Sequence, residues 1–276
     1  VAKRTPLQRN ENLSLQYECN VWLKREDHQN VRSYKIRGAY NKIHSLSSAD
    51  RAKGVICASA GNHAQGFAYA CKQLEIKGRI YMPSTTTAQK IKQVKMFGEH
   101  FVKIILEGDT FDDSYTAAKK ECDEQGLTFV HPFDDPKIIE GQGTVGLEIY
   151  EDSTESFDYL FLPIGGGGLS AGVGSYFKQL SPQTEIIGVE PKGAPAMKKS
   201  IEAGHVVCLD DIDKFVDGAA VKQVGHLTFD ICKEILSDIV LVPEGKICTT
   251  ILQLYNENAI VVEPAGALSV AALDFY

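Results

Sequence analysis

Short apolar runs alternate with longer amphipathic stretches along most of the chain. An apolar run of about four to eight residues predicts a buried strand, whereas apolar residues at intervals of three and four predict a helix. The strand-like segments are residues 20–24, 54–59, 77–83, 100–106, 128–133, 157–164, 185–190 and 238–242. The helix-like segments are residues 33–46, 62–74, 88–98, 111–126, 138–152, 169–180, 194–204 and 247–258. Glycine or proline stands at most of the joints between these segments.

Alternation of strand and helix is typical of parallel sheets, whose strands are joined by crossover helices. The number of strand–helix units predicts an α/β fold with two open, twisted, mostly parallel sheets and helices on both faces. No low-complexity linker and no short-period repeat marks a boundary between domains. The division into domains is therefore not visible in the composition.

Composition excludes several classes of protein. The chain has 276 residues, a formal net charge of −7 and 43% apolar residues, so no basic surface indicates a nucleic-acid partner. No apolar run approaches the ~20 residues of a membrane span, and the first residues contain no apolar segment of a secretory leader. The seven cysteines form no C-x-x-C pair and are interpreted as reduced thiols. We expect a cytoplasmic protein with no membrane partner.

Four glycines, Gly165–Gly168, follow an apolar strand and precede a helix. Glycine lets the backbone approach a ligand closely, and a helix N-terminus favours an anion, so this loop predicts a phosphate site rather than a simple turn. A second interpretation stays open. Gly166, Gly168 and Ala171 also fit the G-x-G-x-x-A pattern of a dinucleotide fold, and Glu190 follows at the end of the next strand. A nicotinamide-dependent oxidoreductase is therefore a real alternative.

The segment "CASAGNHAQG" (57–66) also lies between a predicted strand and a predicted helix. Ser59, Gly61 and Asn62 offer N–H and side-chain donors to a small anion such as a carboxylate, at the strand end where ligands bind in open parallel sheets. An ordinary helix cap explains these residues equally well. His63 alone is a weak indication of acid–base chemistry.

The segment "VVEPAGAL" (261–268) has a sufficient structural explanation. Pro264 suits the first turn of a helix, and Glu263 just before it suits the positive end of the helix dipole. A role near a ligand is not required.

Lys35, in "VRSYKIRGAY", stands at the predicted opening of a helix that Ser33 could cap. The helix dipole disfavours a cation there. A dinucleotide site would explain the glycines but not this lysine. Pyridoxal phosphate needs both, because its aldehyde bonds to a lysine amine and its phosphate needs an anion site.

The segments "SYKIRGA", "SAGNHAQG", "IGGGGL", "GVEP" and "EPAGA" occur in the order found in threonine dehydratases (threonine ammonia-lyases). The chain resembles this family over nearly its whole length. The family belongs to the tryptophan-synthase-β-like (fold type II) class of pyridoxal-phosphate enzymes. The resemblance implies a large cofactor-binding domain of residues 1–49 and 133–276 and a small inserted domain of residues 50–132.

The resemblance also implies roles for individual residues. Lys35 is expected to form the Schiff base with pyridoxal 5′-phosphate and to act as the catalytic base, and Asn62 to contact the 3′-oxygen of the cofactor. The residues expected to bind the cofactor phosphate are Gly165, Gly166, Gly167, Gly168 and Leu169. The residues expected to bind the substrate carboxylate are Ser59, Ala60, Gly61, Asn62 and His63.

The implied reaction converts L-threonine to 2-oxobutanoate and ammonia, with L-serine to pyruvate as a side activity. The substrate is thus a small amino acid, and the resemblance implies a homodimer or homotetramer. Threonine synthase, serine racemase and cysteine synthase share the fold and remain rivals, as does a non-catalytic binding protein that keeps the fold.

The chain departs from the family pattern at two places, and it differs from the related serine racemases at a third. Some relatives bind a divalent ion with the "GVEP" glutamate and an acid six residues on, where this chain has Ala196, so no metal site is predicted. Related serine racemases carry a serine at the position of Ala60, so elimination is expected rather than racemisation. The sequence ends before the family's "SGGN"-like segment, and we expect the end of the fold to lie outside it.

Overall fold

The computed structural model describes residues 1–276, which form two compact units. Unit 1 comprises residues 1–3 and 28–142, and unit 2 comprises residues 4–27 and 143–276. The division implied by the resemblance, a large domain of residues 1–49 and 133–276 and a small domain of residues 50–132, stays a prediction.

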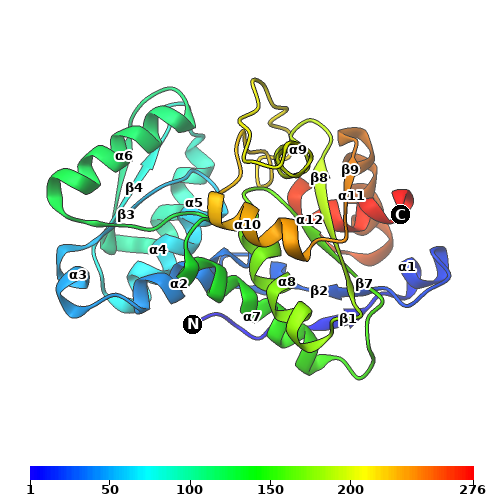
Figure 1. Cartoon of the computed structure of the whole chain (residues 1–276). Coiled ribbons are helices and arrows are strands. Elements are labelled where there is room, and N and C mark those ends of the chain that lie inside the picture. The colour runs from blue at the N-terminus through cyan, green and yellow to red at the C-terminus, as the bar shows by residue number, and fades with distance from the viewer. The chain divides into compact units, whose positions relative to one another are not determined.

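Unit 1 contains the middle of the chain, coloured from blue to green in Figure 1. Its elements are α2 (Lys35–His44), α3 (Ser48–Lys53), β3 (Val55–Ala58), α4 (Asn62–Leu74), β4 (Gly78–Met82), α5 (Ala88–Gly98), η2 (Glu99–Phe101), β5 (Val102–Leu106), α6 (Phe111–Gln125) and β6 (Thr128–Phe129). The boundaries between the units fall within η1 (Glu26–His28) and α7 (Pro136–Asp152).

Unit 2 contains a short N-terminal segment and the second half of the chain. Its elements are β1 (Leu7–Arg9), α1 (Glu11–Gln16), β2 (Trp22–Lys24), β7 (Tyr159–Pro163), α8 (Gly168–Leu180), β8 (Glu185–Pro191), α9 (Ala196–Ala203), α10 (His226–Ile235), β9 (Asp238–Val242), α11 (Glu244–Asn258), α12 (Pro264–Ala271) and η3 (Ala272–Phe275).

The sheet of unit 1 has the order β5-β4-β3-β6, and every neighbouring pair is parallel. Alternate residues of a strand point to opposite faces. Val55 and Cys57 of β3 therefore join one core with α4, whereas Ile56 and Ala58 join another with α6. Helices cover both faces, with α6 on one side of β3 and β4 and α4 on the other (Figure 1).

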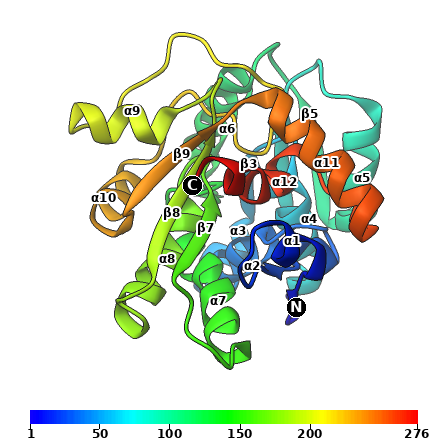
Figure 2. The ribbon, with the colours of Figure 1, turned by 90° about the vertical axis from the view of Figure 1, so that its right-hand side faces the viewer.

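The larger sheet of unit 2 has the order β7-β8-β9 and is also parallel. Ile187 and Val189 of β8 pack into a core with α11 and α12. On the other face, Ile235 of α10 lies against Gly174 of α8, where an added Cβ would come within 2.5 Å of Ile235 Cδ1. Figure 2 shows the three strands side by side, with α10 on one side and α12 on the other. A separate antiparallel pair joins β1 and β2.

Some predicted elements need correction. The segment 128–133, predicted as one strand, is a strand only at Thr128–Phe129, because the chain turns at His131 and Pro132. The helix predicted for residues 33–46 is confirmed between Lys35 and His44. The pattern missed β1, α1 and α3, which have only three to six residues, and it also missed α10, although that helix buries Phe229, Cys232 and Ile235 along one face. No helix combines the length and the apolarity needed to cross a membrane.

Candidate functional site

Lys35 is the first residue of α2, and Tyr34 is its N-cap. The side-chain amine of Lys35 donates a hydrogen bond to the carbonyl oxygen of Pro132 over 2.8 Å. The prediction that Ser33 caps this helix is wrong. Tyr34 already has helical backbone angles (φ −65°, ψ −15°), and the Ser33 hydroxyl lies in the interior without a hydrogen-bond partner. Side-chain capping normally requires an extended backbone at the capping residue.

A close approach between two helices fixes the start of α2. A Cβ added at Gly66 of α4 would lie 2.9 Å from the backbone nitrogen of Ile36 and 2.9 Å from the carbonyl carbon of Lys35. Only glycine allows this contact without displacing the backbone. The glycine at the end of "SAGNHAQG" therefore places α4 directly against the backbone of Lys35.

The segment after β6 forms a turn beside Lys35. Its first residue, Val130, accepts a hydrogen bond from Nε2 of His63 over 2.9 Å. Nδ1 of His131 accepts the backbone N–H of Asp134 over 2.7 Å. The side chain of Asp135 accepts the N–H groups of residues 137 and 138 and so caps α7. The turn that presents the Pro132 carbonyl is thus held at both ends and in its middle.

Two histidines near Lys35 are neutral at neutral pH. Burial lowers the pKa of His63 to about 3, and the positive charge of Lys35 lowers it further. Burial likewise lowers the pKa of His131 to about 4, opposed in part by Asp134. With Nε2 of His63 donating to a carbonyl, its Nδ1 is the unprotonated nitrogen, and this buried atom has no hydrogen-bond partner. The two imidazoles near Lys35 therefore offer Nδ1 atoms that can accept hydrogen bonds, and neither imidazole is a proton donor in the form of an imidazolium.

The loop between β3 and α4 lies beside this turn, because β3 and β6 are neighbouring parallel strands. Ser59, Ala60, Gly61 and Asn62 are half-buried, whereas His63 is buried. Gly61 donates its N–H to the Ser59 hydroxyl over 3.2 Å, and no side chain caps α4. A Cβ at Gly61 would meet no atom within 4 Å. The loop therefore leaves open space above the first N–H groups of α4.

The tetraglycine loop of unit 2 lies at the carboxyl end of β7. Gly167 is the N-cap of α8 and has a positive φ of +93°. A Cβ there would lie 2.8 Å from Met197 Cε and 2.9 Å from Thr228 Cβ. The Thr228 hydroxyl donates to the carbonyl of Gly166 over 2.6 Å, which fixes the direction of that peptide. Both the left-handed backbone and the neighbouring side chains exclude a side chain at this position.

The beginning of α8 has the features of an anion site. The N–H groups of Gly168, Leu169 and Ser170 belong to the first turn, whose donors have no partner within the helix. No side chain caps them. The Ser170 hydroxyl is fully buried and has no hydrogen-bond partner. Because buried polar groups are almost always paired, this hydroxyl marks a place for a ligand.

Glu190 does not serve the dinucleotide alternative. It is 1% exposed, and its carboxylate accepts the N–H groups of Met197 and Lys198 over 2.7 and 2.9 Å, which caps α9. Burial raises its pKa to about 7, opposed by these two hydrogen bonds. A ribose would need the same oxygens. The position that suggested a nicotinamide cofactor therefore has a structural role, and that alternative is wrong.

The predicted site residues divide between the two units, and each group, taken by itself, has a feature that pyridoxal phosphate requires. Unit 1 provides a lysine amine at a helix start together with two unpaired buried polar atoms, Ser33 Oγ and His63 Nδ1. Unit 2 provides a glycine loop and an uncapped helix start over the unpaired Ser170 hydroxyl. An amine for an aldehyde and a cradle for a phosphate are the two requirements of this cofactor.

Comparison with known proteins decides between the families. The model of the family described as pyridoxal-phosphate dependent enzyme matches residues 1–276. The chain belongs to this family. Its cofactor is pyridoxal 5′-phosphate. The predicted α/β class with parallel sheets, and the resemblance to the tryptophan-synthase-β-like enzymes, are thereby confirmed.

Two relatives in this family carry the name "L-threonine dehydratase biosynthetic IlvA". The protein from Halalkalibacterium halodurans is 61% identical over 276 residues, and the protein from Bacillus subtilis is 59% identical. The alignments cover 100% of this chain but only 66% and 65% of those proteins. The chain thus spans just under two thirds of their length.

Two solved structures of the family are similar over essentially the whole chain. Threonine deaminase isoform 2 from Solanum lycopersicum has a TM-score of 0.96 and 44% identity, covering 100% of this chain and 76% of that one. Maize serine racemase has a TM-score of 0.94 and 32% identity, covering 99% and 81%. One fold therefore accommodates members named for different reactions.

Sequence reasoning missed His131, Pro132 and Thr228. Pro132 lies 97 residues from Lys35, and Thr228 lies 62 residues from Gly166. The only local signal was the "HPFDD" segment, in which proline and aspartate interrupt an apolar run. That signal indicates a turn and does not indicate what the turn contacts.

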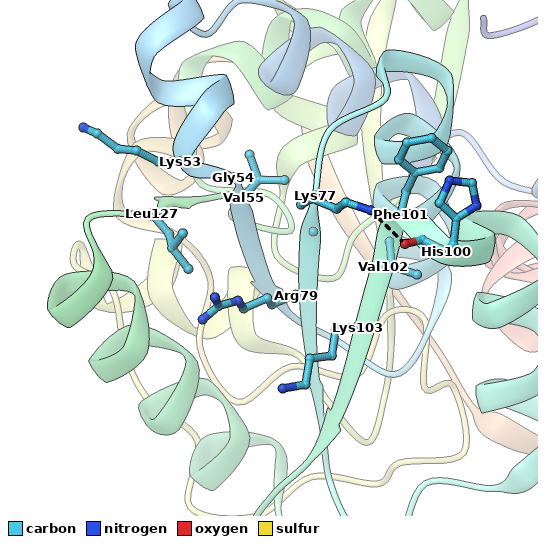
Figure 3. Close-up of a pocket in the computed structure, with 11 residues that line it drawn as sticks. Lys53, Gly54, Val55, Lys77, Arg79, His100, Phe101, Val102, Lys103 and Leu127 are labelled. Carbon is cyan, nitrogen blue, oxygen red and sulfur yellow. Dashed lines mark hydrogen bonds between the residues drawn. The ribbon is translucent and has the colours of Figure 1, made fainter.

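A pocket at the amino-terminal edge of the unit 1 sheet has a different explanation (Figure 3). Lys53 lies in the last turn of α3, where a cation complements the helix dipole. Lys77 donates to the carbonyl of His100 over 3.2 Å, and Arg79 pairs with Glu121. Lys53, Lys77 and Arg79 thus have local structural roles, and their charges do not by themselves indicate a ligand in this pocket.

Proposed function

We propose that this protein converts L-threonine to 2-oxobutanoate and ammonia, with L-serine to pyruvate as a side activity. The observation that carries the proposal is the Lys35 amine, which lies at the start of α2 against the Pro132 carbonyl. The names of the relatives that match the whole chain, threonine dehydratase and threonine deaminase, support the choice of threonine.

Lys35 has two proposed tasks. When bound, pyridoxal phosphate supplies an aldehyde for an amine and a conjugated ring that takes up negative charge from the α-carbon. The Lys35 amine would hold the aldehyde of the cofactor and would also be the base that removes the α-proton of the substrate. Its hydrogen bond to the Pro132 carbonyl fixes the position of the amine.

The loop of Ser59–His63 is the proposed carboxylate site. The uncapped first turn of α4 presents N–H donors and the positive end of a helix dipole, both of which favour an anion. Gly61 leaves the space above these donors open. Asn62, the first residue of α4, is proposed to contact the 3′-oxygen of the cofactor. His63 is neutral and aimed at Val130, so its proposed contribution is to shape the site rather than to transfer a proton.

The tetraglycine loop is the proposed phosphate site. Gly165–Gly168 and Leu169 are proposed to bind the phosphate through their backbone N–H groups, at a helix start where Ser170 adds a buried hydroxyl. The Thr228 hydroxyl donates a hydrogen bond to the Gly166 carbonyl and so fixes the direction of that carbonyl. An anion would then meet donors without an opposing carbonyl at that peptide.

Racemisation is a second candidate, because a serine racemase is among the similar structures. Inverting the α-carbon requires an acid–base group on each face of the planar carbanion. The methyl group of Ala60 cannot transfer a proton, so we propose that elimination of the β-hydroxyl prevails. We also propose a cytoplasmic homo-oligomer that acts on a small amino acid without a divalent metal site.

Steady-state rates with L-threonine and L-serine test the proposal. We expect keto acid and ammonia in equal amounts from both, with higher kcat/KM for threonine. Lys35→Ala should lose at least ~10²–10³-fold in kcat while circular dichroism stays unchanged. Near-normal turnover by that variant, or no keto acid from either amino acid, would contradict the proposal.

A further inference from the structure

The turn that follows β6 is fixed by more hydrogen bonds than its contact with Lys35 requires. Val130 donates its N–H to the Ile56 carbonyl over 2.8 Å and accepts from His63 over 2.9 Å. At the other end, Asp135 caps α7 and pairs with Lys42 over 2.6 Å. Both ends of the turn are therefore fixed to the sheet and to helices of unit 1.

The middle of the turn depends on a single side chain. Nδ1 of His131 accepts the N–H of Asp134 over 2.7 Å and that of Phe133 over 3.3 Å. The imidazole is packed edge-to-face against Phe133, with ring centroids 4.7 Å apart, and lies 6.3 Å from the ring of Tyr115. This arrangement resembles a turn closed by an aspartate or asparagine side chain, with the imidazole nitrogen as acceptor.

The residue enclosed by this turn is Pro132. Proline has no N–H, so its carbonyl is its only backbone hydrogen-bonding group, and its ring fixes φ near about −65°. With the neighbouring peptides held by His131, the carbonyl has one direction, and the Lys35 amine lies 2.8 Å along it. The amine nitrogen is tetrahedral. When one N–H points at a fixed acceptor, the directions of its other N–H bonds and of its lone pair are fixed as well.

We infer that His131 is a positioning residue for Lys35: through Nδ1 it fixes the turn whose Pro132 carbonyl orients the lysine amine. The inference rests on the proposed role of Lys35 and deepens it. His131 does not touch the reacting atoms and transfers no proton in this account. Its neutral state at neutral pH, caused mainly by burial, keeps Nδ1 available as an acceptor.

Two substitutions separate the acceptor from the ring. His131→Asn places an amide oxygen close to the position of Nδ1 and so retains the acceptor. His131→Phe retains the aromatic packing and removes the acceptor. His100→Phe is the matched control, because it makes the same exchange at an exposed histidine of the same unit.

The first readout is the reactivity of Lys35 in the cofactor-free protein. Acetic anhydride in trace amounts acetylates each lysine in proportion to the fraction of its amine that is unprotonated and accessible. Mass spectrometry then compares the acetylation of Lys35 with that of the exposed Lys120. We expect His131→Phe to change the Lys35/Lys120 ratio at least ~3-fold, and His131→Asn and His100→Phe to leave it unchanged. The second readout is kcat, which should fall at least ~10-fold in His131→Phe, with KM within ~3-fold and recovery in His131→Asn.

A native-like His131→Phe protein with unchanged Lys35 labelling would overturn the inference, as would a His131→Asn protein as impaired as His131→Phe. If His131→Phe does not fold, nitrogen NMR of the unmodified protein decides. We expect His131 at neutral pH to carry its proton on Nε2, and a proton on Nδ1 would overturn the inference. Because labelling and NMR need no turnover, failure of the proposed threonine activity remains distinguishable from failure of this inference.

Discussion

Each unit has a candidate loop at the carboxyl end of a parallel strand, after β3 in unit 1 and after β7 in unit 2, but the two units hold their candidate residues by different means. In unit 1, side chains hold the backbone: His63, His131 and Asp135 fix a turn that contacts Lys35. In unit 2, the glycine loop itself takes a conformation that no other residue adopts easily, with φ of +93° at Gly167. A hydrogen-bonded side chain can be replaced by another acceptor of similar reach, whereas a position that excludes Cβ tolerates no replacement. The two regions should therefore differ in which substitutions they accept.

The largest effect is expected at Gly167. Gly167→Ala places a methyl group 2.8 Å from Met197 and 2.9 Å from Thr228 in a left-handed backbone. Strain of about 1–2 kcal/mol and crowding of about 1–3 kcal/mol should lower the free energy of unfolding. We also expect cofactor affinity, measured by fluorescence titration of the cofactor-free protein, to fall at least ~10-fold.

Gly204→Ala is the control for Gly167→Ala. Gly204 also has a positive φ, of +75°, but a Cβ there would meet no atom within 4 Å. It should cost only the backbone strain of about 1–2 kcal/mol and leave cofactor affinity unchanged. Equal cofactor affinities for the two variants would show that the glycine loop is an ordinary turn.

A second pair of glycines sharpens the comparison within unit 1. Gly66→Ala pushes a methyl group into the backbone of Lys35 and Ile36, at 2.9 Å, and should destabilise by about 1–3 kcal/mol while lowering kcat. Gly61→Ala enters open space, so stability should stay within about 0.5 kcal/mol. If the space above Gly61 holds the substrate carboxylate, KM should rise. Denaturant unfolding measures the stability of both variants, and steady-state kinetics measures their kcat and KM. An unchanged KM in Gly61→Ala would argue against a substrate carboxylate above Gly61.

The buried histidines of unit 1 and the buried Glu190 of unit 2 should make the stability depend on pH in opposite directions. His63 and His131 have pKa values lowered to about 3 and about 4 from 6.5, so the unfolded chain binds protons that the folded chain does not. Their contribution to stability is present above pH 6.5 and is lost as pH falls toward 4. The pKa of Glu190 is raised from 4.5 to about 7, so its contribution is present below pH 4.5 and is lost as pH rises through 7.

Denaturant unfolding between pH 4 and 8 measures these contributions. His131→Asn should flatten the loss of stability on the acid side, and Glu190→Gln should flatten the loss between pH 4.5 and 7. The free energy of unfolding of Glu190→Gln could instead have the same pH dependence as that of the unmodified protein. The carboxyl would then be ionised throughout this range, because the Met197 and Lys198 amides stabilise its charge.

The smallest effect is expected at Ala60. Ala60→Ser adds a hydroxyl to a half-buried residue of the proposed substrate loop and should introduce a low level of D-serine from L-serine. Chiral chromatography of both reactions measures it. Substantial D-serine from the unmodified protein would contradict the argument, because another residue would then serve the second face of the carbanion.

Much of the fold was predictable from the sequence. Strands such as Val55–Ala58, with flanking helices of regular apolar spacing, carry their own signal, and all four residues of that strand are buried. Most of the elements that escaped prediction are short, as with α3 (Ser48–Lys53), which has no buried residue. Such helices form because of their caps, here Ser47, rather than because of an apolar face.

The candidate site was predictable only where one segment of sequence contains it. Lys35, the Ser59–His63 loop and the tetraglycine loop are each contiguous motifs. The contacts of Lys35 with Pro132 and of Gly166 with Thr228 join residues far apart in sequence, so no local pattern reports them. Glu190 shows the converse error, since a motif suggested ribose binding for a carboxylate that caps α9.

Borohydride reduction of the purified yellow protein followed by peptide mapping tests the central claim most directly. We predict that reduction fixes the cofactor covalently in a single peptide and that the modified residue is Lys35. Label on any other lysine, or an unmodified Lys35 after complete reduction, would contradict the assignment of Lys35 as the residue that holds pyridoxal phosphate.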